Sequence, residues 1–233
     1  MNNNSIIYND YELNTFSYEY AIKYDKRAFS NYYFSLIKTK HPLFFSFCPI
    51  NDYNSMIIKF DLFFLSFSIY CFINTLFFDE NTIHKIYEEK GIYNFIYLVP
   101  YISYSFIISH TIYIIIKYLS LSERNICEIK NESNFEKAND KIYNVQKSIK
   151  IKYICFFILS LLFLLFFWFY LSSFGAVYQN SQIYLIKNIL ISFGFTLAYP
   201  FIINLFACIF RIYALNGKNR QCIYKISKFI QFI

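Results

Sequence analysis

Four apolar runs dominate the pattern of hydrophobic and polar positions along the chain. They cover residues 62–78, 95–116, 153–174 and 188–210, and none contains Asp, Glu, Lys or Arg. Each is close to the roughly 20 residues that an α-helix needs to cross a bilayer. Lipid offers the backbone no hydrogen-bond partners, and the runs lack the alternation of membrane strands. The sequence therefore predicts an all-α membrane protein with a four-helix transmembrane bundle.

Shorter amphipathic segments flank the predicted bundle. Apolar residues recur at helical spacing over residues 17–37, which predicts one amphipathic helix there. The apolar part of residues 38–52 is too short to span and is expected to rest in the membrane interface or to re-enter. A solvated helix is expected in the 120–150 region. In the C-terminal tail, the apolar residues fall on one helical face and the lysines elsewhere, which is typical of a basic helix on an anionic leaflet.

The distribution of basic residues predicts the orientation of the spans. All but three of the 22 Lys and Arg residues lie before the first run, between the second and third, or after the fourth. The exceptions are Lys85, Lys90 and Lys187. The positive-inside rule then places both termini and the central loop in the cytoplasm. An endomembrane and the plasma membrane fit this pattern equally well.

Pattern and charge together divide the chain into six consecutive parts. They are a polar N-terminal tail (1–14), a cytoplasmic amphipathic helix with an interfacial segment (15–55), a first transmembrane helix pair (56–119), a cytoplasmic loop (120–151), a second transmembrane helix pair (152–211) and a basic amphipathic C-terminal tail (212–233).

The overall composition agrees with a membrane class. The chain is 57% hydrophobic and only 16% charged, whereas soluble domains carry about 25% charged residues. Its net charge of +7 does not indicate a nucleic-acid partner, because the basic residues are spread between apolar runs rather than gathered in one patch.

Charged residues mark the cytoplasmic edges of the predicted spans. Lys117, Lys152 and Arg211 adjoin the second, third and fourth runs, and Lys59 precedes the first. We expect Lys59 to extend toward the lipid headgroups. Asp61 is expected in the first turn of its helix, where the helix dipole stabilises a carboxylate by about 0.3–1 kcal/mol. The alternative is that Asp61 faces the bundle and pairs with Lys152 or Arg211.

One polar side chain lies at a similar depth in each run. Ser66, His110, Ser160 and Asn204 are seven or eight residues inward from the edge charges, which corresponds to about 10–12 Å along a helix. If these side chains face inward, they form a polar layer that supports bundle assembly through hydrogen bonds. One alternative is a proton- or ion-handling site centred on His110, whose imidazole titrates near neutral pH. In the other, the side chains point in different directions and form no layer.

The chain lacks the short motifs of common enzyme classes. Its four glycines form no phosphate-binding loop, and neither GxSxG nor HExxH occurs. The six cysteines show no CxxC pair and no zinc-type spacing with histidine. His84, Glu88 and Glu89 fit an exposed helix face better than a metal site. We therefore predict no catalytic residue, cofactor or metal site, and no enzymatic activity.

Two blocks of sequence resemble a known group of proteins. The first comprises YFSLIKTKHPLFFSF, DYNSMIIKFDLFFLSF, INTLFF and TIHKIYEEKGIYNFIYLVP, and the second is FWFYLSSFGAVYQNSQIYLIKNILISFGFTLAYPF. Together they resemble a four-span module near the C-terminus of large, uncharacterised transmembrane proteins of AT-rich protists. The resemblance covers residues 18–233 and implies that the chain is a short member or a part of a longer protein. That group has no established activity, so the resemblance transfers no functional residue.

The sequence favours a non-enzymatic membrane-anchoring or interaction module. Its expected partners are the lipid bilayer and, because the cytoplasmic parts are larger than the outer loops, a cytoplasmic protein or a second copy of the chain. The alternative function is a small transporter or channel with a polar intramembrane layer around His110 and Asn204.

Overall fold

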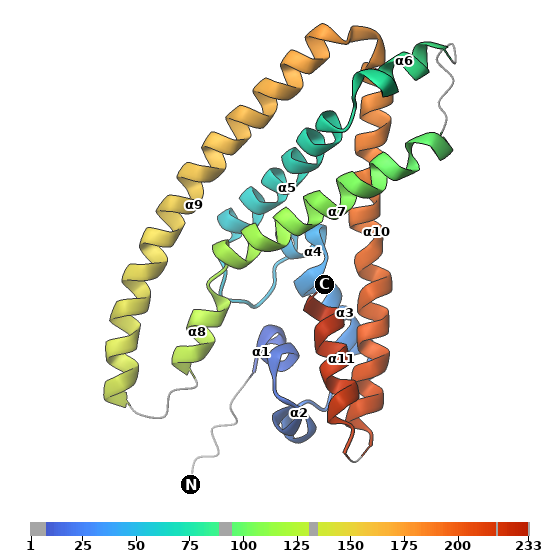
Figure 1. Ribbon diagram of the computed structural model, residues 1–233. Coiled ribbons are helices and arrows are strands. Elements are labelled where there is room, and N and C mark those ends of the chain that lie inside the picture. Colours follow the sequence, from blue (N-terminus) through green and yellow to red (C-terminus); the bar gives the residue numbers. More distant parts are fainter. Residues whose placement is uncertain (1–7, 89–94, 131–134, 218, 233) are drawn as a thin grey trace. The chain divides into compact units, whose positions relative to one another are not determined.

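Helices make up all the regular structure of the residues that can be described. The computed structural model describes residues 8–88, 95–130, 135–217 and 219–232 (Figure 1). Their order is α1 (Asp10–Thr15), α2 (Tyr18–Tyr24), α3 (Phe29–Lys40), α4 (Pro42–Phe47), α5 (Met56–Leu76), α6 (Glu80–Glu88), α7 (Phe95–Ser120), α8 (Glu123–Lys130), α9 (Phe135–Val177), a short 3-10 helix η1 (Gln179–Ser181), α10 (Gln182–Leu215) and α11 (Gln221–Phe232).

Four of the helical segments are long and apolar enough to cross a membrane. They are α5, the segment that begins with α7, α9 and α10. Each contains one of the four apolar runs, so the predicted all-α class with four spanning helices is confirmed. This length and composition indicate an integral membrane protein.

Two helices extend well beyond the predicted spans. Helix α9 has 43 residues and passes without a break through the predicted boundary between residues 151 and 152. The 135–152 segment contains neither Gly nor Pro, and no residue there interrupts the helix. Helix α10 likewise continues past its apolar run and ends at Leu215. The end of an apolar run therefore does not coincide with the end of a helix in this chain.

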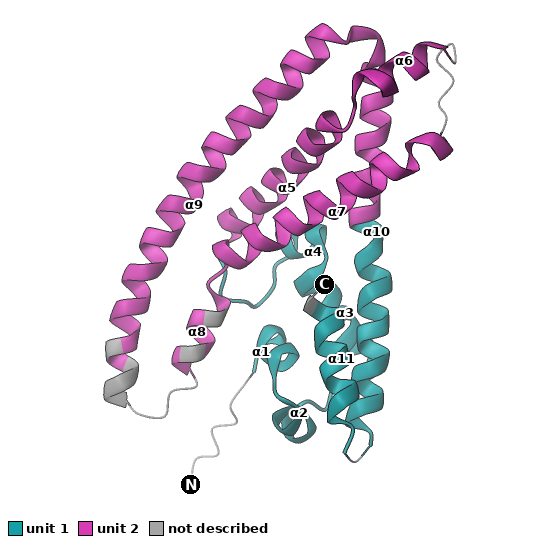
Figure 2. Ribbon diagram, viewed as in Figure 1, with its two compact units in different colours: residues 1–54, 197–233 teal, residues 55–196 magenta. Residues whose placement is uncertain are grey.

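The chain divides into two compact units (Figure 2). We call residues 55–196 the central unit, and residues 1–54 with 197–233 the terminal unit. The terminal unit joins segments from both ends of the sequence. Helix α10 contributes residues 182–196 to the central unit and 197–215 to the terminal unit.

Helix α5 is the most buried spanning helix and packs against α7 and α9 in the central unit. The rings of Phe72 and Phe167 stack with centroids 4.5 Å apart. Polar side chains also join the helices: Trp168 Nε1 donates to Ser68 Oγ at 3.0 Å. Asn74 Nδ2 donates to Ser192 Oγ at 3.1 Å, which links α5 to α10. These bonds satisfy side chains that lipid would leave unpaired.

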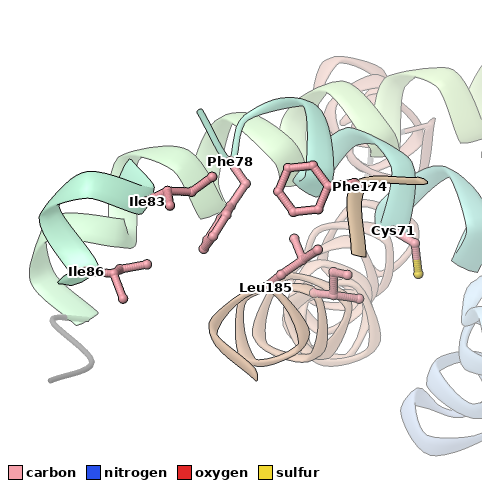
Figure 3. Packing of buried hydrophobic residues seen from close by; sticks show 7 residues of the cluster. Cys71, Phe78, Ile83, Ile86, Phe174 and Leu185 are labelled. Atoms are coloured by element: carbon pink, nitrogen blue, oxygen red, sulfur yellow. The ribbon is translucent and has the colours of Figure 1, made fainter. Parts of the chain in front are cut away.

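An apolar cluster in the central unit brings together residues from α5, α6, α9 and α10. Phe78 and Phe174 meet edge to face with ring centroids 6.2 Å apart (Figure 3). Ile83 and Ile86 lie on the buried face of α6. Its buried members are Cys71, Phe78, Ile83, Ile86, Phe174, Leu185 and Ile189.

The N-terminal part of the chain differs from the sequence prediction. The predicted polar tail folds from Asp10 into α1, which has a capping box between Asn9 and Glu12. The single helix predicted over residues 17–37 is divided into α2 and α3. The break occurs at Asp25, whose backbone is extended at φ −89° and ψ 95°. Periodicity alone did not reveal this break, because the apolar spacing continues across it.

We predict that replacing Asn74 weakens the central unit. The substitution Asn74→Leu removes the bond to Ser192 and should lower the free energy of unfolding by about 0.6–2 kcal/mol. Ser103→Ala is the control, because this exposed hydroxyl bonds only to Val99 O of its own helix. Denaturant unfolding in detergent micelles measures both variants. Equal losses would contradict a stabilising role for the bond between helices.

Candidate functional site

The four residues of the predicted polar layer are divided between the two units. Ser66 and Ser160 are buried in the central unit, where His110 is half-buried and stacks on Phe106 with centroids 5.8 Å apart. Asn204 is buried in the terminal unit. The expected layer of four stays a prediction.

The structure corrects the expectation for Lys59 and Asp61. Lys59 is fully buried within the chain, so its ammonium does not extend to headgroups. Helix α5 begins at Met56, and its first turn contains no acidic residue. Asp61 therefore lies in the second turn, beyond the region where the dipole acts most strongly. The helix starts earlier than the uncharged run because residues 56–58 are themselves apolar.

Lys117 and Lys152 also contact the protein. The Lys117 ammonium lies 5.7 Å from the centre of the Tyr113 ring. Lys152 Nζ donates to the backbone oxygen of Leu121 at 2.7 Å. The neighbouring Tyr153 hydroxyl donates to Ser122 Oγ at 2.7 Å. Lys152 thus ties α9 to the link between α7 and α8 and has no ion pair with Asp61.

Arg211 is the most consequential of the predicted edge charges. Its side chain is fully buried in the terminal unit rather than directed at headgroups. One guanidinium nitrogen, Nη2, donates to Asp25 Oδ2 at 2.8 Å and to the backbone oxygen of Leu13 at 2.7 Å. The other, Nη1, donates to the backbone oxygen of Asn14 at 3.2 Å. A buried cation needs such partners, because an unpaired charge in an apolar interior is very unfavourable.

Asp25 receives a second guanidinium from Arg27. Arg27 Nε lies 2.8 Å from Asp25 Oδ1 and Nη2 lies 2.9 Å from Oδ2, so the contact is bidentate. The carboxylate occupies the extended link between α2 and α3. This break in the predicted helix lets one carboxylate face both arginines. The sequence prediction paired Arg211 with Asp61 as an alternative, and the structure pairs it with Asp25 instead.

Two tyrosine rings flank the Arg211 guanidinium. Its central carbon lies 4.7 Å from the centre of the Tyr32 ring and 5.0 Å from that of Tyr224. Arg27 also lies over Tyr32, at 5.0 Å. Such cation–π contacts strengthen when water is excluded. Burial raises the pKa of the Tyr224 phenol to about 12 and also raises that of Tyr32, so both phenols stay neutral.

Polar side chains from α1 and α3 complete the network. Arg27 donates to Ser35 Oγ at 2.9 Å and to Asn14 Oδ1 at 3.0 Å. Asn14 Nδ2 donates to the same serine oxygen at 3.2 Å. Arg27 also reaches Asp10 at 3.4 Å, in a half-exposed ion pair. We call Arg211, Asp25, Arg27, Asn14 and Ser35 the arginine network.

The protonation state of Asp25 depends on opposing effects. Burial raises its pKa, but the hydrogen bonds and charges of Arg27 and Arg211 together hold it below the ordinary value. A carboxyl whose folded-state pKa is lowered contributes stability at any pH above its unfolded value, near pH 4. That contribution is lost as the pH falls through the folded-state pKa. The network is therefore charged and intact at neutral pH.

The arginine network has the chemistry of a structural clamp. Guanidinium groups stay protonated and do not act as bases. Asp25 is already bonded by both arginines, which leaves it unsuited to accept a proton from a substrate. Within the described residues, no group of three His, Cys, Asp or Glu side chains gathers in a way that fits a metal ion. His84 pairs with Glu88 at 3.2 Å on an exposed helix face, and Glu89 lies outside the described residues.

A second polar contact, at His41, holds α4 against α10 in the terminal unit. His41 Nδ1 accepts from the Leu43 backbone N–H at 3.2 Å and caps α4, whose first residue is Pro42. Because Nδ1 accepts, Nε2 carries the proton and donates to the Leu197 backbone oxygen at 2.9 Å. Burial lowers the pKa of this histidine, which favours the neutral ring. The sequence analysis missed this role of His41. The available signal was that His41 directly precedes Pro42, a residue that is common at the first position of a helix.

Helix α11 docks with only part of its predicted apolar face, because Ile223 and Ile230 pack against buried clusters. The predicted apolar face contains Ile226 and Phe229, and both side chains are exposed. The buried positions are Tyr224 and Ser227, and Ser227 Oγ donates to the Ala207 backbone oxygen at 2.7 Å. The small serine allows a close approach to α10. The buried positions therefore lie beside the predicted apolar face, part of which stays exposed.

No protein-family model, curated protein or solved structure matches the chain. The resemblance to the protist module stays a prediction. The functional argument therefore rests on the residues and contacts described above.

We predict that Asp25→Asn destabilises the terminal unit by about 3–5 kcal/mol, because two buried guanidinium groups then lose their counter-charge. Arg220→Ala is the control. Arg220 lies 4.0 Å over the Tyr213 ring at an exposed site, where such a contact is worth at most about 1 kcal/mol. Unfolding in detergent micelles compares the two. If Asp25→Asn lowers the free energy of unfolding no more than the control does, the arginine network does not stabilise the terminal unit as proposed.

Acidification should also weaken the terminal unit through His41. The unfolded chain takes up a proton near pH 6.5, whereas the buried ring resists it, so stability falls as the pH drops below about 6.5. The loss is complete once the pH is below the folded-state pKa. Thermal unfolding at neutral and mildly acidic pH measures the effect.

The control for this prediction uses two substitutions. His41→Asn keeps a side chain that caps helices but does not titrate, and it should reduce the pH dependence. His84→Gln removes an exposed histidine and should leave it unchanged. Undiminished pH dependence in His41→Asn would assign the effect to another group.

Proposed function

We propose that the chain is a non-enzymatic membrane-anchoring or interaction module with both termini and the 120–150 region in the cytoplasm. The observation that carries this proposal is the terminal unit, in which both ends of the sequence form one folded assembly beside the end of the last spanning helix. The arginine network, which includes Arg211, belongs to this assembly.

Direct contacts join the two ends of the chain. Tyr224 of α11 donates its hydroxyl to the Phe16 backbone oxygen at 2.8 Å. Lys228 Nζ donates to the Thr15 backbone oxygen at 2.7 Å. Segments in such contact belong on the same side of a membrane, which agrees with an even number of spans. The excess of Lys and Arg at both ends supports the cytoplasm as that side.

The surface of α9 supports lipid as one partner. Its apolar residues are exposed on nearly every side of the helix, including Leu161, Leu165 and Phe169. An apolar surface of this size needs a cover, and the hydrocarbon core of a bilayer supplies one. At the other end, α9 extends through the basic residues Lys147 and Lys150, which are also exposed. This extension supports contact with a cytoplasmic partner or with headgroups.

The buried polar groups favour assembly over transport. The bonds from Trp168 to Ser68 and from Asn74 to Ser192 each use a polar side chain to join two helices. These two bonds use the polar side chains in helix packing, which is the role that assembly requires. These observations support the module over a channel.

Two positions with matched exposure test the proposal. Tyr143 and Val177 lie near opposite ends of α9 with 71% and 72% of their surface exposed. We expect a membrane-impermeant maleimide to modify Val177→Cys in intact cells and Tyr143→Cys only after permeabilisation. Mass spectrometry locates the modified residue among the native cysteines. The reverse pattern would overturn the orientation.

The same two positions test the interaction. A photocrosslinker attached at position 143 should capture a soluble cytoplasmic protein or a second copy at reproducible stoichiometry. The crosslinker at position 177 should capture neither and serves as the matched control. Equal capture at both positions, or none at position 143, would contradict an interaction role for the cytoplasmic end of α9.

A further inference from the structure

Helix α4 presents an apolar face directly after two lysines. Its exposed side chains are Leu43, Phe44 and Phe47, which share one side of the helix at spacings of one and four residues. Lys38 and Lys40, in the last turn of α3, are also exposed. Only three positions separate Lys40 from Leu43, so their Cα atoms lie at most about 11 Å apart. Apolar and cationic groups therefore lie close together at this junction of the terminal unit.

Two contacts hold α4 against the spanning helix α10. His41, which caps α4, donates from Nε2 to the Leu197 backbone oxygen at 2.9 Å. Phe44 meets Phe201 edge to face, with ring centroids 6.5 Å apart. Both phenylalanines are exposed. The apolar surface of α4 therefore continues onto a helix that is long and apolar enough to face lipid.

The link that follows α4 favours a position in the membrane interface over re-entry. Residues 48–55 form no helix, and a non-helical backbone exposed to lipid would leave its polar groups without hydrogen-bond partners. The link is also polar: Asn51 is exposed, and the Tyr53 hydroxyl donates to Glu12 Oε1 of α1 at 3.4 Å. The exposed lysines before α4 and the polar link after it both belong in headgroups or water.

Helix α10 is long enough to cross the hydrocarbon before it reaches α4. Its 34 residues correspond to about 51 Å, whereas the hydrocarbon core is about 30 Å thick. The stretch from Gln182 to Phe201 alone accounts for about 30 Å. Its single charged residue, Lys187, lies 5.8 Å over the ring of Tyr184, toward the start of the helix. This length allows the membrane boundary to lie at the level of Phe201, where α4 packs.

We propose that α4 and the end of α3 form a binding site for anionic phospholipid at the membrane interface. Leu43, Phe44 and Phe47 contact acyl chains, and Lys38 and Lys40 bind the negatively charged headgroups. An anionic phospholipid complements both the apolar face and the two ammonium groups. This inference rests on the proposed membrane-anchoring role and names the class of lipid that takes part in it.

Photoactivatable lipids test the proposal on the whole chain in phosphatidylcholine nanodiscs. Separate samples receive a trace of phosphatidylserine or phosphatidylcholine with the same diazirine-bearing acyl chain, so that only the headgroup differs. Mass spectrometry locates the adducts. A lysine near an anionic surface raises affinity about five-fold, so the two lysines should give α4 a preference of about 25-fold for the phosphatidylserine reagent. Leu161 and Leu165, exposed on α9, are the control surface and should be labelled equally by both reagents.

Substitutions of exposed lysines assign the preference to its source. Lys38→Gln and Lys40→Gln should each lower the preference of α4 for phosphatidylserine about five-fold, and the double variant should abolish it. Lys147→Gln, which replaces an exposed lysine of α9, should leave it unchanged. Equal labelling of α4 by both reagents in the native chain would overturn the anionic-lipid site. Adducts on α9 without any on α4 would overturn the contact with lipid.

The same labelling experiment tests the depth of α4 and is separate from the test of orientation. Adducts on residues 49–54 as abundant as those on α4 would show that the segment re-enters the hydrocarbon, and would overturn the interfacial position. Both faces of a nanodisc carry the same lipids, so the result does not depend on which side the termini occupy. A reversed maleimide pattern at positions 143 and 177 would overturn the proposed orientation and leave the lipid preference of α4 unchanged.

Discussion

The terminal unit depends on one buried ion pair, between Arg211 near the end of α10 and Asp25 in the link between α2 and α3. Arg211 also holds the backbone oxygens of Leu13 and Asn14, so the end of α10 joins two N-terminal segments that lie more than 180 residues away in sequence. Replacing a buried ion pair by apolar residues is often neutral for stability, whereas removing one partner is costly. We therefore interpret the Arg211–Asp25 pair as an interaction that specifies which segments pack together, rather than as a large source of stability. It brings both ends of the chain together at the end of a spanning helix.

The central unit follows a different constraint, which is the absence of water around its helices. Backbone groups are satisfied within each helix, and polar side chains bond across helices, as Trp168 does with Ser68. Helix α5 is the most buried of the four spanning helices, and its Ser68 and Asn74 bond to α9 and α10. Helix α9 is the opposite case, with apolar side chains exposed on nearly every side. A membrane protein must pack its own helices together and also present an apolar surface to lipid. The burial of α5 meets the first need, and the exposure of α9 meets the second.

The sequence predicted the coarse features well, because they depend on local composition. Run length and the lack of charge identified all four spanning helices. The contacts of Arg211 were beyond such reasoning, since Asp25 is 186 residues away in sequence and no local pattern specifies the pairing. Periodicity likewise missed the break at Asp25, because the residue serves a distant partner rather than its own helix. Lys59 was assigned to the headgroups by its position at an edge, but the fold buries it.

The central claim is that Arg211 holds the two ends of the chain in one folded unit. Hydrogen exchange in lipid nanodiscs, read by mass spectrometry, tests it most directly by comparing the native chain with Arg211→Met. We predict that the native chain protects the backbone amides of α2 and α11. In Arg211→Met these amides should lose protection, while those of α5 keep theirs. Unchanged protection of α2 and α11 in the variant would contradict the account.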